Sequence, residues 1–227
     1  MLSQGTNPTN EKRDADQHED MRPWVTVFSE TNFVGFAICD QRLRFQAINS
    51  TLAAVNGLSV DAHLGNSLHD LLGDAAEAVT TGFRRVLAVG EAVAPFELVA
   101  KLPRRTEVGH WIESYVPIRS RHGKVIGVGA IVVEVTQQRK VAALFRRFLH
   151  GAPHFRPAEG RLLAGELRAC VEGYNSALTR SMTFLGQRMQ TEPEKLPSVV
   201  AQLDGRLQRM QTLVCEVAAR LPDDSQS

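Results

Sequence analysis

The sequence predicts an α+β fold in which a five-stranded antiparallel sheet carries helices on one face and is followed by a C-terminal helical hairpin. Three observations predict this architecture. Apolar residues alternate with period two within residues 43–49, as they do in a half-buried strand. They recur at helical spacing within residues 75–89. Between Leu196 and Leu221 they recur at alternating intervals of four and three residues, as in a coiled coil.

The elements of the sheet follow in order along the chain. Residues 34–40 and 43–49 are apolar runs separated by the turn-like pair Gln41-Arg42, so they predict a β-hairpin. Residues 50–72 hold short helical pieces, and the helix 75–89 ends at Gly90. Strands are expected over 93–102, 109–119 and 124–135. A hairpin loop, Ser120-Arg-His-Gly123, joins the last two strands and places Gly where φ is positive.

Five segments are expected. Residues 1–23 form a disordered tail, because acidic residues are dense there and no Val, Ile, Leu or Phe occurs between Gln4 and Arg22. The sheet domain occupies 24–136. A linker helix and a break containing two prolines cover 137–157. The helical hairpin covers 158–222, and a short tail covers 223–227.

Composition excludes several classes of protein. Lys and Arg total 26 against 25 Asp and Glu in 227 residues, and this balance argues against bulk nucleic acid or an acidic membrane surface as a partner. No apolar run approaches the roughly 20 residues that span a bilayer. The three cysteines, Cys39, Cys170 and Cys215, form neither a disulfide framework nor a zinc cluster. We therefore expect a cytoplasmic protein with no membrane span and no bound metal.

The C-terminal third contains two long helical patterns, separated by a short turn at Thr191-Glu-Pro-Glu-Lys-Leu-Pro197. The second pattern carries an apolar stripe, called here the heptad seam: Leu196, Val200, Leu203, Leu207, Met210, Val214, Val217 and Leu221. Two helices alone bury such a stripe poorly. The expected solution is a homodimer in which two hairpins form a four-helix bundle. The alternative is that the hairpin folds back onto the sheet of its own chain.

Residues 29–140 resemble a PAS domain of the bacterial sensor type. The matching pieces, in order, are Phe36-Ala-Ile-Cys-Asp40, Phe45-Gln-Ala-Ile-Asn49, Gly65-Asn-Ser-Leu-His-Asp-Leu-Leu72, His110-Trp-Ile-Glu-Ser-Tyr-Val-Pro-Ile-Arg119 and a terminal string from His122 to Lys140. The resemblance implies a PAS fold with a sensory role and no enzymatic activity. It does not name a ligand, since PAS domains share a fold and differ widely in what they bind.

The resemblance also allows two cofactors of this fold to be weighed. A flavin photo-adduct needs a reactive cysteine after the short helices, and no cysteine lies between Cys39 and Cys170, so this chemistry is excluded. Haem needs an axial ligand that faces the pocket. His63 and His69 are the only candidates by position, and surface or capping roles are the favoured interpretation for both. The cofactor therefore stays unknown, and none is required.

A small apolar metabolite remains an alternative ligand. We expect its pocket among the following residues: Phe36, Ile38, Phe45, Asn49, Leu72, Phe83, Tyr115 and Val128. The same apolar side chains would also make a closed core, which is the favoured interpretation. Asn49 would either hold a polar group of the ligand or, as we favour, cap the following helix.

The end of the last strand, from Glu134 to Thr136, is predicted to couple the sheet to the output helix, with the Thr136 hydroxyl capping that helix. Sensor, linker and hairpin together resemble the front part of a sensor histidine kinase, but residues 160–227 contain no His to accept a phosphate. We therefore expect a PAS signalling protein that dimerises and contacts an unidentified signalling protein, in a two-component pathway or in regulation of transcription. The alternatives are a small-molecule or haem sensor and a passive dimerisation scaffold.

Overall fold

The structure is a computed structural model that describes residues 31, 33–140, 142–143, 157–192 and 195–218. The two predicted tails, most of the predicted linker and Leu221 lie outside these residues. For some helical residues the structure describes the backbone but not the side chain. These include residues 157–172, Met210, Val214 and Val217. None of the described helices is both long and apolar enough to cross a membrane.

The five predicted strands form one antiparallel sheet in the order β2-β1-β5-β4-β3. Their bounds are β1 Gly35–Asp40, β2 Phe45–Ile48, β3 Val93–Ala100, β4 Gly109–Arg119 and β5 Val125–Glu134. Gly123, in the loop between β4 and β5, has the predicted positive φ of 76°. The sequence therefore predicted the number of strands and their positions along the chain, because each apolar run is bounded by turn residues.

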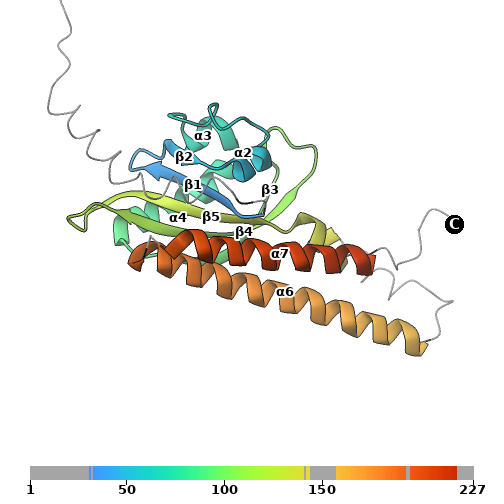
Figure 1. The fold of residues 1–227 in the computed structure, drawn as a ribbon. Helices are drawn as coiled ribbons and strands as arrows, with labels where there is room; N and C mark the ends of the chain where they lie inside the picture. Colours follow the sequence, from blue (N-terminus) through green and yellow to red (C-terminus); the bar gives the residue numbers. More distant parts are fainter. Residues whose placement is uncertain (1–30, 32, 141, 144–156, 193–194, 219–227) are drawn as a thin grey trace, which may run out of the picture.

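Helices cover both faces of the sheet (Figure 1). The helices α2 (Ser50–Asn56), α3 (Leu68–Leu72) and α4 (Ala75–Val89) lie between β2 and β3 in sequence and pack on one face. The C-terminal helices α6 (Pro157–Thr191) and α7 (Leu196–Ala218) form the predicted hairpin and lie against the opposite face. The PAS-like arrangement of sheet and short helices is therefore as predicted, and the hairpin supplies a second covering layer.

Alternation along the central strands divides the interior into two cores. On β4, Trp111 and Tyr115 join the core under α4, whereas Ile112 and Val116 join the core under the hairpin. The strands β1 and β5 alternate in the same way. Because successive side chains of a strand point to opposite faces, one backbone supports both cores. Burial on both faces also explains why β5 is apolar over almost its whole length, and β4 is likewise buried over most of its length.

The described part of the heptad seam is buried within its own chain. Its first four residues, Leu196, Val200, Leu203 and Leu207, are at most 3% exposed. They share one apolar cluster with Tyr174, Leu178 and Met182 of α6 and with Val116, Ile118 and Ile131 of the sheet. These four residues are therefore buried as in the fold-back alternative, and the four-helix dimer stays a prediction. The outer sheet face offers an equally apolar surface within the same chain, so no second chain is needed to bury them.

Polar contacts hold the hairpin in register with the sheet domain. The Asp204 carboxylate of α7 accepts a hydrogen bond from the amide of Phe33, just before β1, at 2.8 Å. The side-chain amide of Gln138 donates to Gln211 of α7 and, at 3.4 Å, to the hydroxyl of Tyr174 on α6. These contacts tie both hairpin helices to the two ends of the PAS-like unit.

Gly82 sets the closest approach of α4 to the sheet. A Cβ added there would lie 2.4 Å from Cε2 of Tyr115, which is far inside van der Waals contact. Tyr115 is fully buried and packs edge-on against Phe83 and Phe96, with ring centroids 4.7 and 5.3 Å away. Its ring therefore has no space into which it can move.

We expect Gly82→Ala to lower the free energy of unfolding by about 1–3 kcal/mol, because overpacking outweighs the helix propensity that alanine adds. Gly173→Ala is the matched control: Gly173 is also helical, but no atom of the described residues lies within 4 Å of its added Cβ. This control should be neutral or slightly stabilising. Urea denaturation measures both variants, and equal stability of Gly82→Ala and the wild type would contradict the packing described.

Candidate ligand cavity and coupling site

A small cavity lies between the sheet and the helices α2, α3 and α4. Its volume is about 50 Å³. Pockets that hold drug-sized ligands measure roughly 300–1,000 Å³, so this cavity has room for a few water molecules at most. Its lining is mostly apolar: Ala37, Phe45, Leu52, Val55, Asn56, Leu68, Leu72, Phe83, Leu98, Leu102, Trp111, Glu113, Ala130 and Val132. In this state the core is nearly closed, as the favoured interpretation of these residues has it.

Strand β4 contributes the polar groups of the cavity region. Trp111, Glu113 and Tyr115 lie two residues apart and therefore share one face of the strand. The Tyr115 hydroxyl donates a hydrogen bond to the Glu113 carboxyl. The buried Nε1 of Trp111 has no hydrogen-bond partner among the described residues. A buried donor left unpaired costs about 1–3 kcal/mol, so the cavity region retains an unused capacity to bind a polar group.

Burial raises the pKa of Glu113 to about 7, and the hydrogen bond from Tyr115 only partly opposes this shift. Burial also raises the pKa of Tyr115 well above its usual range, and the nearby Glu113 adds to that effect. Glu113 thus disfavours ionisation of Tyr115, whereas the hydrogen bond from Tyr115 favours ionisation of Glu113. At neutral pH the cavity region holds a carboxyl close to its titration midpoint, which can donate or accept a hydrogen bond.

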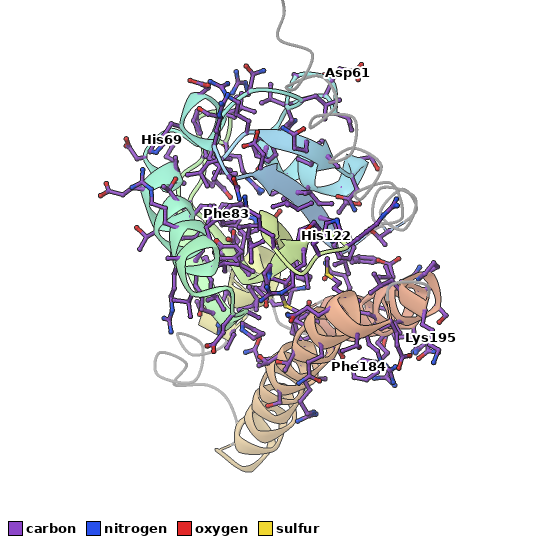
Figure 2. The ribbon with its side chains drawn as sticks, turned by 90° about the vertical axis from the view of Figure 1, so that its left-hand side faces the viewer. Asp61, His69, Phe83, His122, Phe184 and Lys195 are labelled. Carbon is purple, nitrogen blue, oxygen red and sulfur yellow. The ribbon has the colours of Figure 1, made fainter. Side chains whose placement is uncertain are left out.

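Seven of the eight predicted pocket residues, all but Asn49, fall into three groups. Phe45, Leu72 and Phe83 line the cavity, and Phe83 lies inside the sheet domain between α4 and the sheet (Figure 2). Tyr115 and Val128 belong to the same core without lining the cavity. Phe36 and Ile38, in contrast, belong to the core under the hairpin.

Phe36 and Ile38 were predicted to line the pocket, but their side chains lie on the opposite face of β1. Their neighbours on β1, Ala37 and Cys39, face the cavity side instead. All four residues are apolar, so the sequence of β1 does not show which alternate set faces which core. The structure places the small residues toward the cavity and the large ones toward the hairpin.

Asn49 has a structural role, as the favoured interpretation had it. Its side-chain oxygen accepts hydrogen bonds from the amides of Leu52 and Phe36, each at 3.0 Å. Its amide group donates to Thr31 Oγ1 and to the carbonyl of Val34, each at 2.8 Å. Asn49 thereby caps α2 and joins it to β1, and it does not line the cavity.

The two histidines considered for haem occupy different environments. His63 is buried, and its ring nitrogens lie 2.8 Å from the Ser59 carbonyl and 3.1 Å from the Asn56 amide. Burial lowers the pKa of His63, which favours the neutral ring. His69 lies on the exposed outer side of α3, away from Phe83 (Figure 2). Of these two histidines, only His63 is buried. Its ring would have to lose the contact with Asn56 before a ring nitrogen could bind haem iron.

The predicted coupling residues lie at the junction between β5 and the helical residues 136–140. The carboxylate of Glu134 accepts two hydrogen bonds from Arg105, at 2.7 and 2.8 Å, and the Arg105 guanidinium also lies 5.6 Å from the ring of Trp111. The Thr136 hydroxyl accepts a hydrogen bond from the backbone amide of His110 at 3.0 Å. Thr136 is itself the first helical residue, so its hydroxyl ties the helix start to β4 and does not act as the predicted cap.

Sequence reasoning did not single out Trp111 or Glu113. The usable signal was the period-two pattern of residues 109–119, which places Glu113 on the same strand face as Trp111 and Tyr115. An acidic side chain between two aromatic ones at i−2 and i+2 must be buried with them once the strand is covered. Which face is covered by α4, however, depends on the tertiary structure.

Comparisons with known proteins agree with this fold. A family profile described as PAS fold matches residues 33–140, and these residues adopt that fold. A search of curated protein sequences finds no match. Among solved structures, the PAS domain of Bordetella pertussis BvgS is 19% identical, with a TM-score of 0.46 and coverage of 60% of this chain and 99% of that one.

Two further solved structures extend the comparison beyond an isolated PAS domain. Vibrio cholerae VqmA, in a complex with ligand and DNA, is 16% identical, with a TM-score of 0.46 and coverage of 80% of this chain and 87% of that one. The LOV protein of Rhodobacter sphaeroides is 15% identical, with a TM-score of 0.44 and coverage of 73% and 97%. At these identities the similarity concerns the fold alone.

We expect the stability of the protein to fall as pH rises through the range in which Glu113 ionises. In the folded chain this carboxyl keeps its proton up to about pH 7, whereas an ordinary glutamate loses it near 4.5. The folded state therefore binds more protons within this window, and the wild type should lose on the order of 3 kcal/mol across it relative to Glu113→Gln.

Urea denaturation at several pH values between 5 and 8 measures this effect. The exposed Glu77→Gln serves as the control and should keep the pH profile of the wild type. Parallel profiles for the wild type and Glu113→Gln would show that Glu113 ionises normally in the folded protein.

Proposed function

We propose that this chain is a PAS signalling protein in which a change in the cavity alters the packing of α6 and α7 on the opposite face of the sheet. The single observation that carries the proposal is the alternation along β4. Trp111 and Glu113 face the cavity region, while Ile112 and Val116, at alternate positions of the same strand, support the hairpin. A shift of the strand that accommodates a ligand on one face therefore displaces the surface on which the hairpin rests.

A second route leads from the cavity region to the hairpin. Trp111 lines the cavity, its ring lies against Arg105, and Arg105 holds Glu134 at the end of β5. The chain continues from Glu134 through Thr136 to Gln138, which donates to α7. This route supports the proposed coupling role of Glu134 and Thr136, because both residues lie between the cavity and the first contact with the hairpin.

The proposed output is a contact between the hairpin and another protein, with no enzymatic step in this chain. Regulation of transcription is one setting for such a contact. A homodimer remains part of the proposal, but the first four residues of the heptad seam are already buried within the chain. Any dimer must therefore use other surfaces or the end of α7 that lies outside the described side chains. Light scattering on the full chain measures the oligomeric state directly.

A second candidate function is the binding of a small polar molecule in the cavity itself. The observation in its favour is the pairing of an unpartnered donor, Trp111 Nε1, with the protonatable carboxyl of Glu113 on the same strand face. A compound with one acceptor and one donor would satisfy both groups. An absorption spectrum of the purified protein, combined with mass spectrometry of extracted compounds, tests for such a ligand and for haem.

We expect that filling the cavity changes the hairpin. Ala130 lines the cavity from β5 and is 5% exposed, so Ala130→Leu adds volume where a ligand would. Amide hydrogen exchange should change by about tenfold or more in α6 and α7, which corresponds to roughly 1.4 kcal/mol in their local opening. The matched control is Val99→Leu on the edge strand β3, where the side chain is 52% exposed.

Cooperative urea unfolding of both variants, measured first, establishes that each is folded. The proposed function predicts altered exchange in the hairpin for Ala130→Leu and wild-type exchange for Val99→Leu. If Ala130→Leu alters exchange in α4 and β5 but leaves α6 and α7 as in the wild type, the two faces of the sheet are not coupled and the proposed function is wrong.

A further inference from the structure

A groove runs between α6 and α7 on their outer side. Two adjoining hollows of about 430 and 290 Å³ share Ala177, Ser181, Leu203 and Arg206 and so form one continuous depression. The α6 side is low because Ala177 and Ser181 are small and lie one turn apart. Leucine side chains and Val199 complete an apolar floor. This surface is separate from the cavity, and its leucines, which are at most 3% exposed, also belong to the core under the hairpin.

Three arginines border the groove: Arg180 on α6, and Arg206 and Arg209 on α7. Each of the three residues is exposed. Among the described residues, no carboxylate forms an ion pair with any of these guanidinium groups. The nearby carboxylates are otherwise engaged, since Glu192 pairs with Arg188 and Lys195, and Asp204 accepts the amide of Phe33. The rim is therefore positively charged over an apolar floor.

An exposed aromatic side chain marks one end of the groove. Phe184 lines the hollow and is 45% exposed, on the side of the hairpin turned away from the sheet (Figure 2). The guanidinium of Arg188 lies 5.1 Å from the centre of its ring. A large apolar side chain held in place at the edge of a groove is typical of an anchor for a binding partner.

We propose that this groove binds a short amphipathic helix of a partner protein, with apolar side chains on the floor and acidic side chains against the three arginines. At about 1.5 Å per residue, the stretch from Val199 to Arg209 extends about 15 Å, which matches a helix of about ten residues. Helices of this kind commonly dock with apolar residues at i, i+3, i+4 and i+7. The inference rests on the proposed function, because it identifies the chemistry of the partner that reads the hairpin.

Charge favours such a partner over the other occupants. In a two-fold dimer the same patch lies on both chains, so the arginines of one copy would lie close to those of the other. The acidic segment from Glu11 to Asp20 of this chain complements the arginines, but it contains no Val, Ile, Leu or Phe to fill the floor. Nucleic acid would use the arginines and leave the apolar floor uncovered. An acidic amphipathic helix alone satisfies both features.

The test uses the full chain and a defined probe. The probe is a fluorescent 14-residue peptide, cross-linked to stay helical, with leucine at i, i+3, i+4 and i+7 and glutamate on both flanks. One control peptide carries lysine in place of glutamate, and another has the same composition with the leucines scrambled. Fluorescence anisotropy should show binding of the glutamate peptide, with at least about tenfold weaker binding of both controls.

Protein variants locate the binding site. The double variant Arg206→Glu with Arg209→Glu should weaken binding of the glutamate peptide by about tenfold or more and should bind the lysine peptide in its place. Arg84→Glu, an exposed charge reversal on α4 within the PAS domain, is the matched control and should bind as the wild type does. Circular dichroism verifies that each variant is folded.

Several outcomes overturn the proposal. One is equal binding of the glutamate and lysine peptides; another is unchanged binding by the double arginine variant. If the probe binds only after residues 1–23 are removed, the occupant is the acidic segment of the chain itself. If light scattering shows a dimer that the double variant disrupts, the occupant is a second copy. None of these results depends on hydrogen exchange in Ala130→Leu, so this proposal and the proposed function can fail separately.

Discussion

The structure depends on burial of one sheet on both faces. Each residue of β1, β4 and β5 must suit the core under α4 or the core under the hairpin, and the strand period assigns residues alternately to the two cores. A shift of one residue in register would exchange the two sets and place Glu113 against the hairpin. Because that exchange would disrupt the packing of both cores, burial of both sheet faces also specifies the register of the strands. The same constraint places the cavity and the hairpin on the two sides of one backbone.

Glu113 is the costliest group in this arrangement. Burial raises the pKa of this carboxyl and favours its neutral form. Its hydrogen bond with Tyr115 uses only part of its hydrogen-bonding capacity. Trp111 adds a buried N–H without a partner among the described residues. An apolar pair at these two positions would pack without either cost. The retained polar groups therefore support a role in binding or sensing, which is the pattern expected where function and stability conflict.

The hairpin has two surfaces with different chemistry. Its inner surface is apolar, is buried against the sheet and is tied to the PAS domain through Asp204 and Gln138. Its outer surface carries the arginine-bordered groove between α6 and α7. Both surfaces belong to the same pair of helices, so the proposed coupling would act on the groove through the packing of the inner surface. The cavity, the sheet and the groove thus form one connected stack of elements.

The sequence by itself determined the elements: five strands, a long helix before β3 and a C-terminal helical hairpin. Local periodicity and turn residues are sufficient for this, because they act over a few residues. Only the tertiary structure decided what covers each apolar face. The heptad seam was visible in the sequence, but its described residues are buried in one core with α6 and the sheet of the same chain. Phe36 and Ile38 were correctly predicted to be buried but were assigned to the wrong core, and the Thr136 hydroxyl binds His110 of β4. Apolar pattern indicates that a surface must be buried, whereas the surface that buries it can lie anywhere along the chain.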